Sequence, residues 1–124
     1  MAPQGSLTGR QILVVEDDYF IADDLDRGLK GAGAEVLGPF SRVEEARQSL
    51  RGQTPAAAVL DINVAGTMIY PLAQQLRDAG VPILFATGYD VHAIPKQFDA
   101  VPRLVKPIEI RQLLASLANV LSTP

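Results

Sequence analysis

The sequence lacks cysteine and contains a single histidine, His92. The absence of cysteine excludes a disulfide framework and thiolate metal sites. With one histidine, neither a histidine-based metal site nor a Cys–His catalytic pair can be built. We therefore interpret His92 as a surface residue.

Three further features are missing. There is no basic stripe, and a net charge of −3 with a pI near 5.0 disfavours direct binding to nucleic acid. No G-x-G-x-x-G motif follows the first apolar run, so a dinucleotide-binding fold is unsupported. No apolar run is long enough to cross a membrane, and residues 1–9 lack the apolar core of a signal peptide. These absences favour a cytoplasmic protein without membrane contact.

The composition that is present describes a globular domain. The chain has 124 residues, of which 48% are hydrophobic, enough for a core. We expect residues 1–10 to form a flexible tail and residues 11–121 a single domain. No linker, internal repeat or output domain is visible in the sequence.

One stretch organises the rest, the apolar run of residues 56–60 that leads directly into Asp61. A continuous apolar run of this length is typical of a strand buried on both faces of a parallel sheet. Asp61 should then emerge at the carboxyl edge, where open α/β sheets bind ligands. The alternative is a loop aspartate that caps the next helix.

Two other strand ends favour the ligand-binding interpretation. Residues 12–15 lead into Glu16, Asp17 and Asp18, and residues 104–105 lead into Lys106. Two strand ends thus deliver acids and a third delivers a lysine.

The remaining pattern alternates short strands with helices. Apolar periodicity, glycines and prolines predict strands at 11–15, 35–37, 56–60, 82–86 and 103–105. They predict helices at 18–30, 41–51, 68–79 and 107–121, with a short helix interrupted by Pro95 within 90–99. Ser41 and Glu44 match a capping box, and the periodicity places Tyr19 and Phe20 on the apolar side of the first helix with Ala22, Leu25 and Leu29. The alternation predicts an α/β fold with a parallel sheet covered by helices on both faces.

In such a sheet Glu16, Asp17, Asp61, Thr87 and Lys106 can converge. Clustered carboxylates repel and need a cation or shifted pKa values. Hard oxygen ligands select Mg²⁺, and a metal with a lysine and a hydroxyl can neutralise and hold a phosphoryl group. A carboxylate among these groups can act as a nucleophile and form an aspartyl phosphate.

In the order and spacing of these residues the chain resembles the receiver domain of two-component response regulators, from residue 11 to about residue 121. The resemblance implies a doubly wound, flavodoxin-like sheet of five parallel strands in the order 2-1-3-4-5. It implies that Asp61 accepts a phosphoryl group from a histidine kinase or phosphotransfer protein. It also implies that Lys106 pairs with that group and that Thr87 bonds it.

The resemblance also implies the metal ligands and the partners. Asp17 and Asp61 would bind Mg²⁺ with the backbone carbonyl of Asn63, and Glu16 would hold the ion through water. The Lys106–Pro107 peptide would be cis. A downstream protein would receive the signal, and Asp18, which matches no ligand of the family, is interpreted as a residue at the start of the first helix.

The chain departs from most receivers at the fifth strand. The position that usually holds a tyrosine or phenylalanine switch is Arg103. Residues 85–89 read Phe-Ala-Thr-Gly-Tyr, which resembles a receiver subgroup of alphaproteobacterial general stress signalling that lacks this aromatic. Tyr89 is a candidate substitute, or else a partly exposed loop aromatic. We expect Arg103 to face outward, toward a partner, because burial of an unpaired guanidinium is costly.

Two other function classes remain as alternatives. Aspartyl-phosphate phosphohydrolases also use a strand-end aspartate and a lysine, but they carry a second aspartate where this chain has Asn63. A phosphorylation-independent binding module with the same fold would normally lose the acids or the lysine, and all are present here. The sequence leaves the cognate kinase, the downstream target and the oligomeric state open.

Overall fold

Five parallel strands form the centre of the molecule in the computed structural model, which describes residues 7–88 and 94–122. The sheet order is β2-β1-β3-β6-β7, and each neighbouring pair is parallel. Counted along the chain, this is the predicted order 2-1-3-4-5, so the fold prediction is confirmed. The strands are β1 (Gln11–Val15), β2 (Glu35–Phe40), β3 (Ala57–Asp61), β6 (Ile83–Thr87) and β7 (Arg103–Val105).

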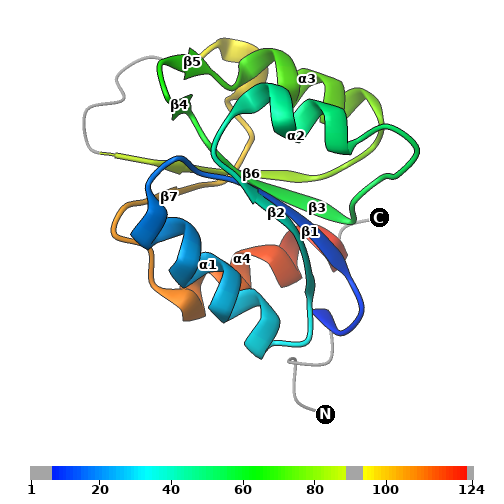
Figure 1. Cartoon of the computed structure of the whole chain (residues 1–124), viewed down its shortest axis with the longest axis vertical. Coiled ribbons are helices and arrows are strands. Elements are labelled where there is room, and N and C mark those ends of the chain that lie inside the picture. Colours follow the sequence, from blue (N-terminus) through cyan, green and yellow to red (C-terminus); the bar gives the residue numbers. More distant parts are fainter. Residues whose placement is uncertain (1–6, 89–93, 123–124) are drawn as a thin grey trace.

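Helices cover both faces of the sheet, as Figure 1 shows. Each face has its own apolar core, because the strands are buried on both sides. One face packs against α1 (Tyr19–Gly31) and α4 (Ile110–Ser122). The other packs against α2 (Val43–Ser49) and α3 (Tyr70–Asp78), with the short 3₁₀ helix η2 (Lys96–Phe98) beside α3.

Asp18 determines where α1 begins. Its carboxylate accepts hydrogen bonds from the backbone N–H groups of Phe20 and Ile21, at 2.9 and 3.1 Å. These are donors that the first helical turn leaves free, so Asp18 is the N-cap. The interpretation of Asp18 as a helix-start residue is confirmed.

The aromatic side of α1 was predicted wrongly. Tyr19 and Phe20 are 75% and 78% exposed, whereas Ala22, Leu25 and Leu29 are buried as expected. The two rings contact each other edge to face, 5.7 Å between centroids, outside the core. Apolar periodicity alone does not distinguish the first turn of this helix, whose aromatic side chains are exposed, from the later turns that pack in the core.

The predicted capping box at α2 is also wrong. The N-cap is Arg42, without a side-chain cap hydrogen bond, and Ser41 lies before it. The side chain of Glu44 pairs instead with Arg47, at 2.9 Å. The position of Val43 in the core fixes the start of this helix.

The second strand is longer than predicted, because it continues through Gly38 and Pro39 to Phe40. The register with β1 shifts between Leu13 and Val15, which accommodates the extra residue as a bulge. Gly38 has φ +104°, and an added Cβ would lie 2.9 Å from the carbonyl oxygen of Val14. Only glycine fits this bulge.

The stretch after Asp61 forms a small hairpin rather than the expected loop. Its strands are β4 (Asn63–Val64) and β5 (Thr67–Met68). Ala65 and Gly66 have φ +51° and +87°, as a type I′ turn requires at both central positions. The predicted third helix therefore begins later, at Tyr70, with Pro71 in its first turn.

Other boundaries differ by a few residues. The predicted last helix from Pro107 begins at Ile110, and the Lys106–Pro107 peptide is cis as the resemblance implied. The short helix expected within 90–99 is η2, which follows Pro95; residues 89–93 lie outside the described residues. Four of the five expected helices are thus α-helices, and the short one is the 3₁₀ helix η2.

The packed domain includes residues before the expected boundary at residue 11. Leu7 is buried in the core below α1, and the N–H of Gly9 donates to the carbonyl oxygen of Gly33 at 2.9 Å. Residues 1–6 lie outside the described residues. Within the described residues, none of the helices has the length and apolarity needed to span a bilayer.

Candidate functional site

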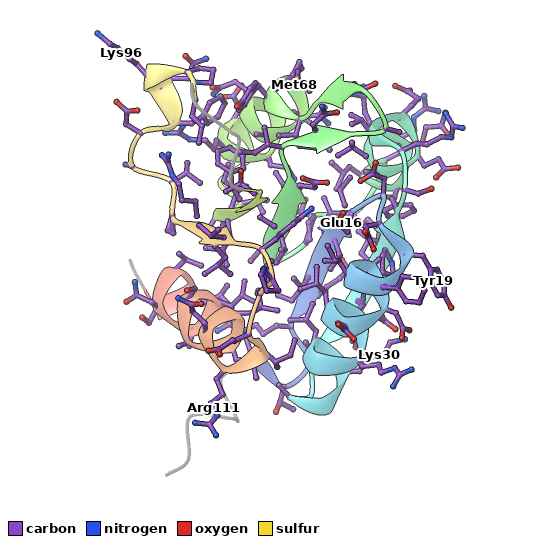
Figure 2. The ribbon with its side chains drawn as sticks, turned by 90° about the vertical axis from the view of Figure 1, so that its left-hand side faces the viewer. Glu16, Tyr19, Lys30, Met68, Lys96 and Arg111 are labelled. Atoms are coloured by element: carbon purple, nitrogen blue, oxygen red, sulfur yellow. The ribbon has the colours of Figure 1, made fainter. Side chains whose placement is uncertain are left out.

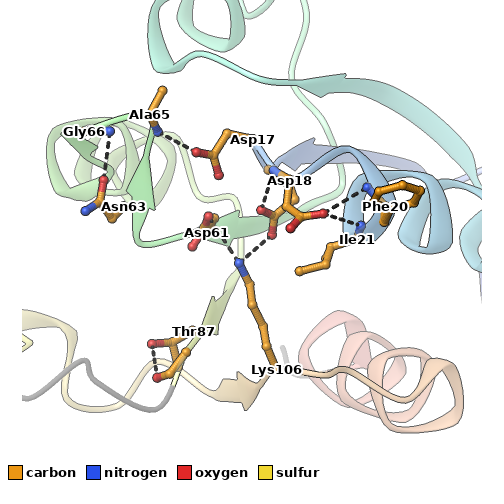
Figure 3. Close-up of polar contacts among 12 residues, drawn as sticks. Asp17, Asp18, Phe20, Ile21, Asp61, Asn63, Ala65, Gly66, Thr87 and Lys106 are labelled. Carbon is orange, nitrogen blue, oxygen red and sulfur yellow. Dashed lines mark hydrogen bonds and ion pairs between the residues drawn. The ribbon is translucent and has the colours of Figure 1, made fainter.

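The carboxyl ends of four strands meet at one edge of the sheet and bring the predicted residues together (Figure 3). Glu16 follows β1, Asp61 ends β3, Thr87 ends β6 and Lys106 follows β7. Across the described chain, the polar or charged residues that are buried are Glu16, Asp61 and Thr87. Because buried polar groups are costly without partners, their concentration at one edge marks a site rather than a packing feature.

Lys106 links the two buried acids. Its ammonium nitrogen Nζ lies 2.9 Å from Glu16 Oε1 and 3.3 Å from Asp61 Oδ2. The backbone N–H of Lys106 donates to the carbonyl oxygen of Thr87 at 2.8 Å, which fixes the lysine against the end of β6. A fixed cation beside two carboxylates is an arrangement that can accept an anionic group.

Glu16 is held from both its backbone and its side chain. Its N–H donates to the carbonyl oxygen of Phe40 at 2.9 Å, and its Oε2 accepts from the N–H of Asp18 at 3.0 Å. The carboxylate is therefore positioned by the turn from β1 into α1. Glu16 is 2% exposed, so this position is maintained within the protein.

Asp17 reaches across to the β4–β5 hairpin. Its Oδ2 accepts a hydrogen bond from the N–H of Ala65 at 2.9 Å, and Asn63 Oδ1 accepts from the N–H of Gly66 at 3.0 Å. Ala65 has a positive φ and lies in the hairpin turn, so this hydrogen bond ties the acid to the turn. Sequence reasoning missed Ala65, and the Val-Ala-Gly-Thr stretch at a hairpin turn was the signal that could have revealed it.

The pKa of Asp61 is raised to about 7. Burial is the largest cause and the negative charge of Glu16 adds to it, while the charge of Lys106 works in the opposite direction. For Lys106, burial disfavours the charged form, but the contacts with Glu16 and Asp61 outweigh it and raise the pKa. The lysine therefore stays charged, and Asp61 is the acid whose ionised form is disfavoured by its surroundings.

Asp17 behaves differently from Asp61. Burial acts to raise its pKa, but the hydrogen bond from the Ala65 N–H is among the contacts that lower it overall. Asp17 is exposed, whereas the other two acids are buried. The site thus combines one readily ionised carboxylate with one that resists ionisation.

These acids fit a hard divalent cation. One carboxylate oxygen each from Glu16, Asp17 and Asp61 lies within 4.8 Å of the others, near enough to surround one ion. Oxygen-only ligands of this kind are suited to Mg²⁺. A cation would also offset the repulsion that raises the pKa of Asp61.

The backbone carbonyl of Asn63 is compatible with the role that the resemblance gave it. The N–H of Ile69 donates to the carbonyl oxygen of Ile62 at 2.9 Å, so this pair is hydrogen-bonded. Pairs alternate in an antiparallel ladder, and the next pair, Asn63 with Met68, is then the non-bonded kind. The Asn63 carbonyl therefore points away from β5.

The remaining predicted residues are placed as follows. The hydroxyl of Thr87 donates to the carbonyl oxygen of Gly88 at 3.1 Å, so it is not directed at Lys106 in this structure. Arg103 lies on β7 and is exposed, as expected. Tyr89 and His92 lie outside the described residues.

Exposed apolar side chains border the site. Tyr19 and Phe20 follow the acidic turn, and Figure 2 shows Tyr19 pointing away from the body of the protein while Glu16 lies within it. A groove of about 310 Å³ beside them is lined by Glu16, Asp17, Tyr19, Ala22, Asp23, Asp26, Pro39 and Ser41. Of the three clustered acids, Glu16 and Asp17 therefore line a groove beside α1.

Comparisons with known proteins agree with this geometry. The sequence pattern of the response regulator receiver domain matches residues 12–118. The solution structure of SdrG from Sphingomonas melonis is 31% identical, with a TM-score of 0.77 over 94% of this chain and 98% of that one. A chain described as a response regulator from Chloroflexus aurantiacus is 29% identical, with a TM-score of 0.80 over 94% and 100%.

Among curated proteins, the sensory transduction protein LytT of Bacillus subtilis is 28% identical over 111 residues. That match covers 86% of this chain and 46% of LytT. The chain therefore spans about half the length of the curated relatives it matches.

Proposed function

The chain belongs to the family of response regulator receiver domains, and from this premise we propose that Asp61 accepts a phosphoryl group from a histidine kinase or a phosphotransfer protein. Receiver domains act in two-component signalling and are generally not enzymes. The observation that carries the proposal is a nucleophilic carboxylate at a strand end, buried and 3.3 Å from a lysine ammonium.

The transfer would be an in-line displacement at phosphorus. An oxygen of Asp61 forms the new P–O bond, the P–N bond to the donor imidazole breaks, and the imidazole leaves with the electron pair. Lys106 lies where it can bond a phosphoryl oxygen, and the Thr87 hydroxyl can rotate from Gly88 to donate to another.

Receiver domains bind Mg²⁺ at an acidic pocket, and here Asp17, Asp61 and the Asn63 carbonyl would hold it, with Glu16 acting through water. The ion would neutralise charge on the transferred group. The bound ion would also neutralise part of the negative charge of Glu16 and Asp61, which Lys106 balances without it.

The signal would leave through a protein partner. Arg103 is exposed on β7 and offers a planar fork of donors to carboxylates. We propose that residues 87–99 and Arg103 together form the surface that binds the partner, called the partner face. Tyr89, which lies outside the described residues, is a candidate switch within it. The chain would work as a stand-alone receiver, residues 11–121 forming its one domain; the near-complete coverage of the SdrG and Chloroflexus chains supports this.

A role in general stress signalling is the finer proposal. Its support is the Phe-Ala-Thr-Gly-Tyr motif at residues 85–89 and the absence of a fifth-strand aromatic. A cytoplasmic location stays a prediction.

The test is phosphorylation by acetyl phosphate and by purified histidine kinases, followed by intact-mass measurement. We expect a single addition of one phosphoryl group that needs Mg²⁺ and is lost with EDTA. Asp61→Asn should abolish it, while the matched control Asp24→Asn, an exposed acid on α1, should be labelled like the wild type. A label of equal yield on Asp61→Asn would refute Asp61 as the acceptor.

A further inference from the structure

Three aromatic rings connect α3, β6 and η2 on one face of the sheet. Tyr70 stacks on Phe98, 5.4 Å between centroids and 22° between planes, and meets Phe85 edge to face at 6.0 Å. Phe85 and Phe98 also contact each other at 5.7 Å. The guanidinium of Arg77 lies 5.3 Å from the centre of the Phe98 ring and covers the cluster. Tyr70 thus joins the start of α3 to the segment that precedes β7.

The hydroxyl of Tyr70 is unsatisfied. Its oxygen is buried and has no hydrogen-bond partner among the described residues. Buried tyrosine hydroxyls usually have a partner, and an unpaired one destabilises the conformation that buries it. A conformation that supplies a donor or acceptor would therefore be favoured.

Arg103 is a candidate partner by topology and charge. It is the register partner of Phe85 in the parallel pair β6–β7, so its side chain projects on the face that Phe85 and Tyr70 occupy. Burial raises the pKa of the Tyr70 phenol, and the charge of Arg103 works in the opposite direction, so the two groups interact electrostatically. Arg103 makes no hydrogen bond or ion pair within the described chain, although its guanidinium carries five donors.

Thr87 connects this pair to the phosphoryl site. It lies on the same face of β6 as Phe85, about 7 Å farther along the strand, and its register partner on β7 is Val105. To bond a phosphoryl group, its hydroxyl must leave the carbonyl oxygen of Gly88. A shift at the end of β6 is then transmitted to β7, which carries Arg103.

We propose that phosphorylation closes a hydrogen bond between the Arg103 guanidinium and the Tyr70 hydroxyl, so that a pair drawn from β7 and α3 serves as the switch. This rests on the proposed function of Asp61. In this arrangement Tyr70 supplies the aromatic ring and Arg103 the moving donor. The position of Phe98, which is stacked on Tyr70, then reports the state of the site to the partner face.

Tyr70→Phe tests the hydroxyl without removing the ring. The ligand-free protein should be as stable as the wild type or more so, because the variant lacks the unpaired oxygen. Beryllofluoride with Mg²⁺, a mimic of the phosphoryl group, should bind about 5-fold more weakly, the coupling expected for one switch contact. A hydroxyl with only a structural role would change both states alike.

The full experiment is a double-mutant cycle read by beryllofluoride titration and by amide chemical shifts. Tyr70→Phe and Arg103→Met should each weaken binding, and the double variant should be no weaker than either single one. The shift change at residues 96–98 should be lost in Tyr70→Phe while that at Asp61 remains. Arg111→Met, at an exposed arginine on α4, is the matched control for Arg103→Met and should match the wild type.

Two outcomes overturn the proposal in distinguishable ways. If Tyr70→Phe binds beryllofluoride as the wild type does, or if the two single effects simply add, the pair is not the switch although Asp61 still receives the mimic. If the wild type itself does not bind beryllofluoride and takes no phosphoryl label, the function of Asp61 fails and this proposal fails with it.

Discussion

Asp61 is the residue at which the fold and the chemistry meet most directly. The apolar strand β3 carries it to the sheet edge, and it remains only 7% exposed. Burial and the charge of Glu16 raise its pKa to about 7, which makes the ionised form costly before any cation binds. The ionised carboxylate is destabilised while no cation is bound. Binding of a metal ion, or phosphorylation, would therefore remove an unfavourable charge at this residue.

This raised pKa gives the metal-free protein a predictable pH dependence. The folded state binds the Asp61 proton more tightly than the unfolded chain, where the pKa is near its ordinary value of 3.8. The contribution of Asp61 to the free energy of unfolding should therefore be largest at low pH and fall as pH rises from about 4 to about 7. Between pH 5 and 7.5 we expect Asp61 to reduce the free energy of unfolding by roughly 2 kcal/mol.

Urea denaturation in EDTA at the two pH values measures this effect as the difference between the wild type and Asp61→Asn. Other titrating groups contribute to both proteins and cancel in that difference. Parallel pH dependence of the two proteins would show that Asp61 has an ordinary pKa.

At the scale of elements, α1 and α4 pack closely because α1 carries Gly28. A Cβ added at Gly28 would lie 2.6 Å from Ile110 Cδ1 and 2.9 Å from Cγ2. Both branches of a β-branched side chain would collide, and one rotamer change cannot remove both contacts. Gly28 lowers the intrinsic helix propensity of α1, but the absence of a Cβ allows this close packing.

Gly28→Ala should lower the free energy of unfolding by about 1 kcal/mol, because the overlap outweighs the gain in helix propensity. Gly31→Ala, with no atom within 4 Å of its added Cβ, should be neutral or stabilise by up to about 1 kcal/mol. Urea denaturation measures both. Ile110→Ala should relieve the effect of Gly28→Ala, and equal effects of the two glycine substitutions would disprove the packing argument.

The elements show which features the sequence could predict. The strands at 11–15 and 103–105 were located correctly, and so was the edge that gathers Glu16, Asp61 and Lys106, because continuous apolar runs determine buried parallel strands. The β4–β5 hairpin was missed because two-residue strands carry no periodicity. The Tyr70–Arg103 juxtaposition depends on register between distant segments, which local patterns do not encode.

At the scale of the whole molecule, the acidic edge couples the metal to global stability. Its three acids come from two strands, and the hairpin after β3 is tied to Asp17 through the Ala65 N–H. Only Lys106 pairs with two of these acids in the described chain. Unfolding disperses the acids, so a cation that needs all of them binds the folded state alone.

Mg²⁺ should therefore raise the melting temperature. For a dissociation constant on the order of 1 mM, 10 mM Mg²⁺ stabilises the fold by about 1.4 kcal/mol, or about 5 °C.

Asp17→Asn should stabilise the metal-free protein by easing repulsion, and its Oδ1 can still accept from Ala65 N–H, so the hairpin contact survives. The same variant should lose most of the Mg²⁺ response, whereas the exposed Asp24→Asn should keep it. Thermal unfolding over a Mg²⁺ titration separates these cases, and an Asp17→Asn protein that still gains the full 5 °C would remove Asp17 from the ligand set.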